Sequence, residues 1–396
     1  MIIKQLNNNI FYLGANDQST LLFEALWPIP QGISYNCYLI NDEKTVLIDT
    51  VKKEFNQELI TAISSILKDK PLDYLVINHM EPDHSGTLSK LKQLYPNLTV
   101  VGNHKTVSFM QGFYDIAETG IKQVATGDKL ALGKYNLEFI QTAMVHWPES
   151  MVTYETVTHT LFSSDLFGGY KAVEDQPFAD DRLDLEIFID EARQYFATVL
   201  GATTRAAHKT LAALPKLNIQ TIAPGHGLVW QKKAKQIMSL YQDWAEFKAK
   251  PGVTIVYGSM YGFTQEIAQL MAEQLKQEKI PVNLLNVSQT NLAALLNSIW
   301  QYQGLIIGSC TYNNGLFPVI KTLLDALADR KLKNKYLGIF GSYSWTGGAM
   351  RFLTEFAENS KLELIQPQFE TQYKLNQESK KAALTLAKNM AKALKN

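Results

Sequence analysis

The feature that most constrains this chain is the stretch at residues 78–86, NHMEPDHSG, which places two imidazoles and two carboxylates within six residues. It directly follows an apolar run at 74–77 that predicts a buried strand. Pro82 argues against a helix interior, so the side chains are predicted to project from a loop at the strand's end. If alternate residues of an extended loop face one way, His79, Glu81 and Asp83 converge while His84 turns to a neighbouring position. The cluster predicts two adjacent metal sites, and the alternative is a solvated polar loop with chance histidines.

Three further metal-capable residues occur where apolar runs end. They are His146 in AMVHWP, Asp165 in FSSDLFGG and His226 in PGHG, each flanked by a glycine or proline that turns the backbone. A single histidine or aspartate at such a position is structural more often than not. Their occurrence together, downstream of the dense cluster, favours a shared metal site.

Length and composition exclude several classes of protein. A chain of 396 residues predicts two or three domains. With 38 basic and 38 acidic residues, no nucleic-acid or anionic-membrane partner is expected. No apolar run reaches the roughly 18 residues of a membrane span, and the first residues lack a secretion signal, so a cytoplasmic location is expected. Only Cys37 and Cys310 are present, which excludes a disulfide framework, an iron–sulfur cluster and an attached four-thiolate rubredoxin domain.

The pattern of elements changes along the chain. Residues 1–249 read as strands with short helices and a long helical segment at Asp184–Leu214, which predicts a sheet sandwich covered by helices. The polar stretch 248–252 marks a boundary. Residues 250–396 alternate strand and helix regularly, which predicts a doubly wound parallel sheet. The predicted fold class is therefore α/β, with domains 1–249 and 250–396.

Three loops of the second domain combine glycines, hydroxyls and aromatic residues at successive strand ends. In a doubly wound sheet, the loop between the first strand and first helix binds phosphate. That loop is neither GxGxxG nor a P-loop, so a mononucleotide is favoured over a dinucleotide. The alternative is that all three are simply tight turns. The candidate residues are Ser259, Met260, Tyr261, Gly262, Phe263 and Thr264 in the first loop, Thr311, Tyr312, Asn313, Asn314 and Gly315 in the second, and Ser342, Tyr343, Ser344, Trp345, Gly347 and Gly348 in the third.

The order of the metal-capable residues resembles the metallo-β-lactamase superfamily, whose loop reads HxHxDH and is followed by His, Asp and His. Here Glu81 replaces the second histidine, and a further carboxylate favours iron over zinc. One iron is then expected to bind His79, Glu81 and His146, and the other Asp83, His84 and His226, with Asp165 bridging them. The three loops of the second domain resemble those of flavodoxins, which bind FMN.

A lactamase-like module followed by a flavodoxin-like module resembles the flavodiiron proteins (A-type flavoproteins) over essentially the whole chain. The resemblance implies two iron ions and FMN, and reduction of dioxygen to water, of nitric oxide to nitrous oxide, or of both. It also implies rubredoxin or a similar electron donor, and a head-to-tail homodimer or a dimer of dimers. Tyr195 matches a family tyrosine near the metals and is interpreted either as a proton donor or as a packing residue.

Some positions depart from the family pattern. Phe263 stands where the family often has a hydroxyl, Cys310 replaces a common proline and Ser344 a common glycine, which puts details of FMN binding in doubt. Glu24-Ala25-Leu26-Trp27 is unusual for the loop near the metals and leaves substrate preference open. Two rival functions remain: a zinc hydrolase fused to a flavodoxin-like module, and an electron carrier or sensor that uses only FMN.

Overall fold

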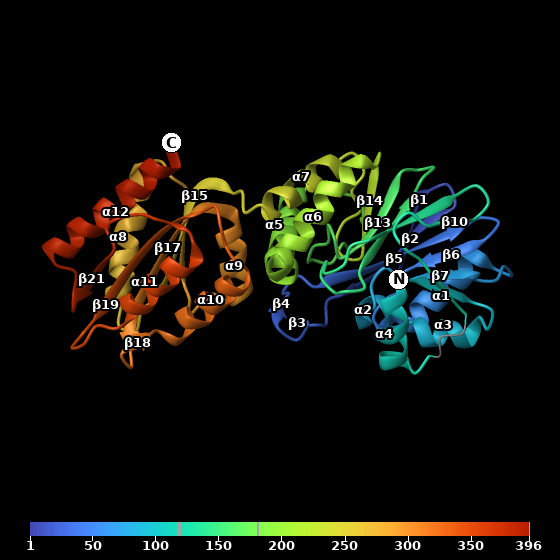
Figure 1. Ribbon diagram of the computed structural model, residues 1–396, viewed down its shortest axis with the longest axis horizontal. Coiled ribbons are helices and arrows are strands. Elements are labelled where there is room, and N and C mark those ends of the chain that lie inside the picture. Colours follow the sequence, from blue (N-terminus) through green and yellow to red (C-terminus); the bar gives the residue numbers. More distant parts are fainter. Residues whose placement is uncertain (117–119, 180–181, 396) are drawn as a thin grey trace. The chain divides into compact units, whose positions relative to one another are not determined.

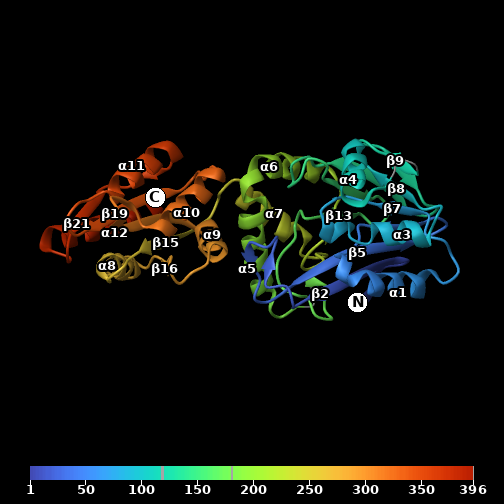
Figure 2. The same ribbon diagram turned by 90° about the horizontal axis from the view of Figure 1, so that it is seen from below.

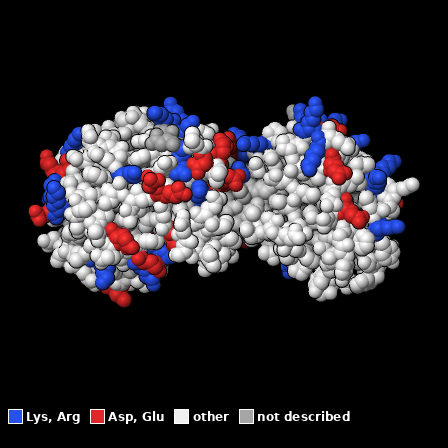
Figure 3. All heavy atoms as spheres, turned by 180° about the vertical axis from the view of Figure 1, so that it is seen from behind, with Lys and Arg blue, Asp and Glu red and all other residues white. Residues whose placement is uncertain are grey.

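The computed structural model describes residues 1–116, 120–179 and 182–395. The chain divides into two compact units, Met1–Gln242 and Asp243–Asn396, which are described separately. On the face drawn in Figure 3, basic and acidic side chains are interspersed, as the balanced charge of the sequence predicts. No helix in the described part of the chain combines the length and apolar character needed to cross a bilayer.

The first unit contains a seven-stranded sheet in the order β1-β2-β5-β6-β7-β8-β9. β1, β2, β5 and β6 pair antiparallel, whereas β6 to β9 pair in parallel. β5 and β6 are buried almost throughout, so this part of the sheet forms core. Its strands are β1 (Ile2–Asn7), β2 (Ile10–Asp17), β5 (Ile33–Asn41), β6 (Thr45–Ile48), β7 (Tyr74–Val76), β8 (Thr99–Gly102) and β9 (Ile121–Gln123), and a small hairpin is made by β3 (Leu22–Phe23) and β4 (Trp27–Pro28).

A second, five-stranded sheet in the order β10-β11-β12-β13-β14 packs against the first. The Tyr38 ring of the first sheet packs at a tilt against Phe162 of the second, with ring centroids 5.1 Å apart, and the Tyr38 hydroxyl donates to the Pro224 carbonyl at 2.7 Å. β12 and β13 are buried along their whole length. The strands are β10 (Lys129–Ala131), β11 (Asn136–Gln141), β12 (Met151–Glu155), β13 (Thr160–Ser164) and β14 (Thr221–Pro224).

Helices flank both sheets, which completes the predicted sandwich. α1 and α3 lie beside the first sheet, and α5 to α7 beside the second (Figures 1 and 2). The predicted helical segment at 184–214 is two α-helices joined by π- and 3₁₀-helical turns at 196–203. The helices are α1 (Asn56–Leu67), α2 (Pro82–Ser85), α3 (Leu88–Leu94), α4 (His104–Tyr114), α5 (Leu185–Tyr195), α6 (Thr204–Ala213) and α7 (Ala234–Ala245).

The second unit is a parallel sheet in the order β16-β15-β17-β19-β20, with β21 parallel to β19 and β18 antiparallel to β17. α8 and α12 cover one face and α10 and α11 the other, which is the predicted doubly wound arrangement (Figure 2). The strands are β15 (Lys250–Gly258), β16 (Val282–Asn286), β17 (Tyr302–Tyr312), β18 (Gly315–Leu316), β19 (Tyr336–Tyr343), β20 (Glu363–Leu364) and β21 (Phe369–Gln372). The helices are α8 (Phe263–Gln277), α9 (Leu292–Gln301), α10 (Pro318–Asp329), α11 (Ala349–Ser360) and α12 (Gln377–Lys395).

One local prediction was wrong. The residues after Glu81 are not a loop, because Pro82 begins the short helix α2, where a proline is tolerated at the first position. In the second unit, β15 begins at Lys250, and a register shift between Lys250 and Val253 accommodates Pro251 beside β17.

Candidate metal centre and flavin loops

The metal-capable cluster begins where β7 ends, and Asp49 fixes its start. The Asp49 carboxylate, at the end of β6, accepts hydrogen bonds from the backbone N–H of Asn78 at 2.7 Å and of His79 at 3.4 Å. The Asn78 side chain donates to the Phe162 carbonyl at 3.2 Å and so ties the loop to the second sheet. Parallel strands ending side by side therefore place His79 between the two sheets.

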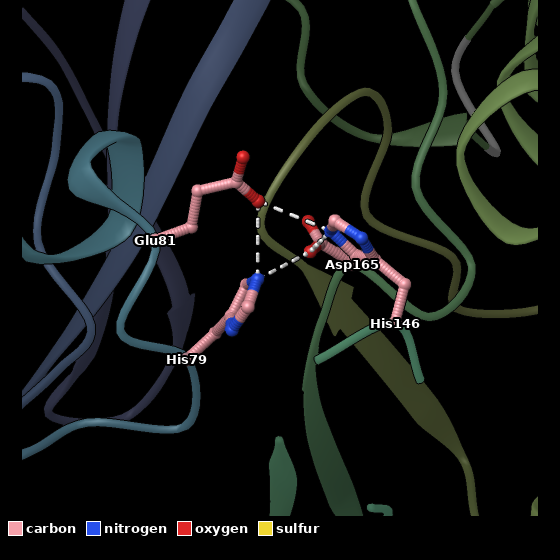
Figure 4. A group of neighbouring side chains, drawn as sticks. All are labelled: His79, Glu81, His146 and Asp165. Carbon is pink, nitrogen blue, oxygen red and sulfur yellow. Dashed lines mark hydrogen bonds and ion pairs between the residues drawn. The ribbon is translucent and has the colours of Figure 1, made fainter. Parts of the chain in front are cut away.

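One group of side chains consists of His79, Glu81, His146 and Asp165, drawn in Figure 4. The Glu81 Oε2 atom lies 3.2 Å from His79 Nε2 and 3.1 Å from His146 Nε2. The Asp165 Oδ2 atom lies 3.2 Å and 3.1 Å from the same two nitrogens. Two imidazole nitrogens and two carboxylate oxygens therefore converge on one point, from three separate segments of the sequence.

The second group consists of Asp83, His84 and His226. The His226 Nε2 atom lies 3.4 Å from Asp83 Oδ2, and His84 Nε2 lies 3.7 Å from Asp83 Oδ1. The expectation that Asp83 converges with His79 and Glu81 was wrong. The helical turn of α2 replaces the extended loop, so Asp83 and His84 face the same group.

Asp165 lies between the two groups. Its Oδ2 faces His79 and His146, while its Oδ1 lies 2.9 Å from His84 Nε2 and 3.4 Å from His226 Nε2. Asp165 directly follows β13, and its side chain is almost fully buried. One carboxylate with an oxygen toward each group has the geometry of a bridge between two ions.

A second layer of hydrogen bonds orients the imidazoles. The His79 Nδ1–H donates to Glu149 Oε1 at 2.7 Å, and the His226 Nδ1–H donates to the Ser34 carbonyl at 2.8 Å. Both bonds leave Nε2 facing the cluster, as metal-binding histidines require. The sequence analysis missed Glu149 and Ser34. Glu149 stands three residues after His146, but only the fold brings it to His79.

Tyr195 and Gly225 complete the immediate surroundings. The Tyr195 hydroxyl donates to Asp165 Oδ1 at 2.8 Å from the end of α5, and the side chain is fully buried. At Gly225, a Cβ atom would lie 2.5 Å from His84 Cε1, so only glycine leaves room for that ring. The glycine of PGHG is therefore explained by the approach of the backbone to His84.

The electrostatics of the cluster favour bound cations. Burial alone would lower the pKa of His79, but Asp165, Glu149 and Glu81 outweigh it and raise that pKa well above its usual value. Burial would also lower the pKa of His146, but neighbouring carboxylates raise that pKa to about 9. Burial would raise the pKa of Asp165, but the surrounding histidines hold it well below its usual range. The buried carboxylates are therefore stabilised by nearby positive charge, which two metal ions would supply.

Unpaired buried atoms point the same way. Among the described residues, both carboxylate oxygens of Asp83 and the His226 Nε2 atom are buried without a hydrogen-bond partner. Such atoms are costly unless a ligand or ion satisfies them. The donor set of imidazoles and carboxylates suits iron, so these residues fit a pair of iron ions.

The three predicted flavin loops meet at the carboxyl edge of the second unit's sheet. A small cavity is lined by residues of all three, among them Ser259, Thr264, Thr311 and Ser342. The Thr264 hydroxyl lies 2.8 Å from that of Ser342, which joins the first loop to the third. A Cβ at Gly348 would lie 2.4 Å from the Asn314 carbonyl, so the second and third loops are in close contact.

The rim of this edge is aromatic. Tyr261 and Trp345 are 84% and 85% exposed, and Phe263 and Tyr343 also line the cavity. The first loop ends at Gly262, whose φ of 95° is unfavourable for other residues, before α8 offers its unpaired N–H groups. This helix end therefore offers hydrogen-bond donors suited to a phosphate, and exposed aromatic side chains surround it.

The two units define a class of protein in which a lactamase-like module with paired metal sites precedes a flavodoxin-like module. A family model described as ODP family beta lactamase matches residues 33–227, and one described as Flavodoxin matches residues 255–385. The chain is 34% identical over 363 residues to a nitric oxide reductase of Moorella thermoacetica, covering 91% of this chain and 90% of that protein. It is 33% identical over 351 residues to the anaerobic nitric oxide reductase flavorubredoxin of Pectobacterium carotovorum, covering 87% and 69%.

Solved structures of other proteins are similar to this chain over nearly its whole length. The rubredoxin oxygen:oxidoreductase of Desulfovibrio gigas superposes with a TM-score of 0.93 at 28% identity, covering 99% of this chain and 98% of that one. A flavoprotein of Thermotoga maritima superposes with a TM-score of 0.90 at 28% identity, with the same coverage. The chain belongs to the flavodiiron protein family.

Proposed function

We propose that this protein is an oxidoreductase that reduces dioxygen to water, nitric oxide to nitrous oxide, or both, at two iron ions supplied with electrons through FMN. The observation that carries the proposal is the Asp165 carboxylate, which turns one oxygen toward each of two groups of imidazoles and carboxylates. The names of the relatives, which include nitric oxide reductases and an oxygen oxidoreductase, support the same reaction.

The side chains of the two groups would hold the ions. His79, Glu81 and His146 would hold one iron and Asp83, His84 and His226 the other, and Asp165, with one oxygen toward each group, would serve both. The iron pair supplies the electrons and the binding position for the diatomic gas. The Nδ1–H bonds to Glu149 and Ser34 hold the imidazoles in one tautomer, and Tyr195 donates to the bridging carboxylate and limits its rotation.

The flavin loops would hold FMN at the edge of the second sheet. The first loop and the N-terminus of α8 bind its phosphate, and the other two loops flank its ring. Phe263 lines the cavity instead of a hydroxyl-bearing residue, so Ser259, Thr264 and backbone N–H groups would hold the phosphate. The domain boundary between residues 249 and 250 remains our proposal.

We further propose a rubredoxin-like electron donor and a head-to-tail homodimer that brings the flavin of one chain to the irons of the other. Exposed apolar side chains near both sites support such contacts. They are Leu21, Leu22 and Leu26 beside the metal-bearing unit's hairpin, and Met260, Tyr261, Phe263, Tyr312, Trp345 and Tyr373 around the flavin loops. A cytoplasmic location agrees with Cys37 and Cys310, which are both free thiols.

Anaerobic turnover tests the proposed reaction. The iron- and FMN-loaded protein receives reduced rubredoxin and a known dose of O2 or NO in an electrode chamber. Loss of one gas or of both at a rate that needs the protein is the expected result, and Asp165→Asn is expected to abolish it. If the donor reduces FMN while both gases remain, the proposal is refuted.

The zinc hydrolase alternative is less well supported. Glu81 adds a carboxylate to the first group where a zinc site of this fold type would have a histidine, and the flavodoxin-like unit has no role in hydrolysis. Metal analysis of protein expressed with both metals available separates the two functions, since the hydrolase would retain zinc.

A further inference from the structure

A cavity of about 460 Å³ leads from the surface to the metal-capable carboxylates. Glu81 and Asp83 line it and keep 14% and 13% of their side chains exposed, whereas Asp165 and His226 keep 2% or less. Solvent and a small substrate therefore reach the cluster through this cavity. Its other lining residues are Thr20, Leu22, Phe23, Glu24, Ala25, Tyr35, Lys52, Lys53, Glu54, Pro82, Gly86 and Tyr114.

Glu24 is set into the wall of this cavity by an unusual turn. It connects β3 to β4, and both Glu24 and Ala25 adopt left-handed backbone conformations, with φ of 50° and 55°. Such conformations are costly for residues other than glycine and often accompany function. The Trp27 Nε1–H donates to Glu24 Oε2 at 3.0 Å, which fixes one oxygen of a carboxylate that lines the cavity and is also exposed to solvent.

The surroundings of Glu24 raise the pKa of its carboxyl. Partial burial, and after it the Glu81 carboxylate, raise the pKa of Glu24 above its usual value, against the opposite effects of His146 and the Trp27 bond. Lys52 does not neutralise it, because its ammonium is bound by Asp17 and Thr20 at 3.3 Å and 2.9 Å. The other charged or titratable groups facing the cavity or acting on Glu24 are Tyr35, Lys53, Glu54, Asp83, Tyr114 and Asp165.

We propose that Glu24 delivers protons from solvent to the substrate in this cavity. The inference rests on the proposed function, whose two reactions both consume protons: O2 with four electrons and four protons gives two waters, and two NO with two electrons and two protons give N2O and one water. In each transfer the O–H bond of the Glu24 carboxyl breaks, the proton passes through cavity water to a substrate oxygen, and solvent reprotonates the carboxylate.

Tyr195, the proton donor considered from the sequence, is less suited to this role. It is fully buried, its hydroxyl donates to Asp165, and it is not among the described residues that line the cavity. A proton lost from Tyr195 would have no direct return from solvent. Glu24 has contact with both the solvent and the cavity, and Tyr195 remains a positioning residue for Asp165.

The test compares Glu24→Gln with Glu24→Asp and with Glu54→Gln, which removes a carboxylate from the same cavity. All are loaded with iron and FMN, and their iron and FMN contents are measured first. We expect Glu24→Gln to lower gas consumption by at least about tenfold, to lose the alkaline fall in rate, and to be rescued by formate. Glu24→Asp keeps that pH dependence at a reduced rate, and Glu54→Gln keeps it as in the parent protein.

A second readout needs no turnover. In the oxidised, iron-loaded protein, an infrared pH titration is expected to show the carbonyl band of a protonated carboxyl that is absent from Glu24→Gln and present in Glu54→Gln. Trp27→Phe removes the hydrogen bond to the Glu24 carboxylate. This variant is expected to consume gas more slowly in the absence of formate while keeping its iron. If the parent protein is active and the Glu24→Gln variant shows the same pH profile and the same infrared band, the proposed role of Glu24 is refuted. A parent protein that consumes neither gas refutes the proposed function itself.

Discussion

Replacing Glu149 by alanine is expected to weaken iron binding, although Glu149 is not itself a proposed ligand. Its Oε1 accepts hydrogen bonds from His79 Nδ1 at 2.7 Å and from the Met80 backbone N–H at 2.9 Å, and its side chain is 1% exposed. Loss of the carboxylate partner of a metal-binding histidine typically costs about 10- to 100-fold in metal affinity, or roughly 1.4 to 2.7 kcal/mol. The buried N–H groups left unpaired should also lower the free energy of unfolding by about 2 kcal/mol.

The assay is anaerobic competition for Fe²⁺ against a chelator, with urea unfolding of the iron-free protein in parallel. Glu155→Ala is the matched control. Glu155 is also fully buried and accepts hydrogen bonds from Val157 and Thr158, but it stands at the opposite end of β12 from Glu149. The Glu155→Ala variant should be less stable to urea than the parent protein but should keep its iron affinity. If Glu149→Ala binds iron within twofold of the parent protein, the argument that Glu149 orients His79 is wrong.

Three further predictions concern single residues. Asp17→Asn should unfold more easily by about 2 kcal/mol at pH 7, and urea titrations should show the difference shrinking from pH 4 to pH 2, because hydrogen bonds outweigh burial and lower the native pKa of Asp17 to about 2. Gly225→Ala should displace His84 and leave less than two irons per chain by metal analysis, whereas Gly112→Ala, with nothing within 4 Å of the new methyl, should not. Burial lowers the native pKa of Lys335 to about 7, so the free energy of unfolding should rise between pH 7 and pH 10. A Lys335→Met variant that shows the same rise would contradict this prediction.

Much of the architecture could be predicted because its signals are local. The alternation of strands and helices after residue 250 predicts a doubly wound sheet, and the family comparison confirms the lactamase-like and flavodoxin-like fold classes. The seven metal-capable residues were recognisable because each stands at the end of a strand or apolar run. Strand ends are where a sheet brings distant residues together.

The missed features depend on contacts between distant parts of the chain. Glu149 and Ser34 look like ordinary polar residues until the fold places them beside His79 and His226. The helical turn of α2 was hidden by Pro82, which ends helices in their interior but begins them at the first position. The role of Glu24 could not be read from its sequence context either, since it depends on a left-handed turn and on a cavity formed by several segments.

The proposed joining of two iron ions into one centre by Asp165 can be examined by Mössbauer spectroscopy of the ⁵⁷Fe-loaded oxidised protein. We expect two irons per chain whose spins are coupled, so that the spectrum shows quadrupole doublets and no magnetic splitting at low temperature and in a weak field. Asp165→Asn is predicted to weaken or abolish that coupling. One iron per chain, or two irons that behave as isolated paramagnetic ions in the parent protein, would show that Asp165 does not join two irons.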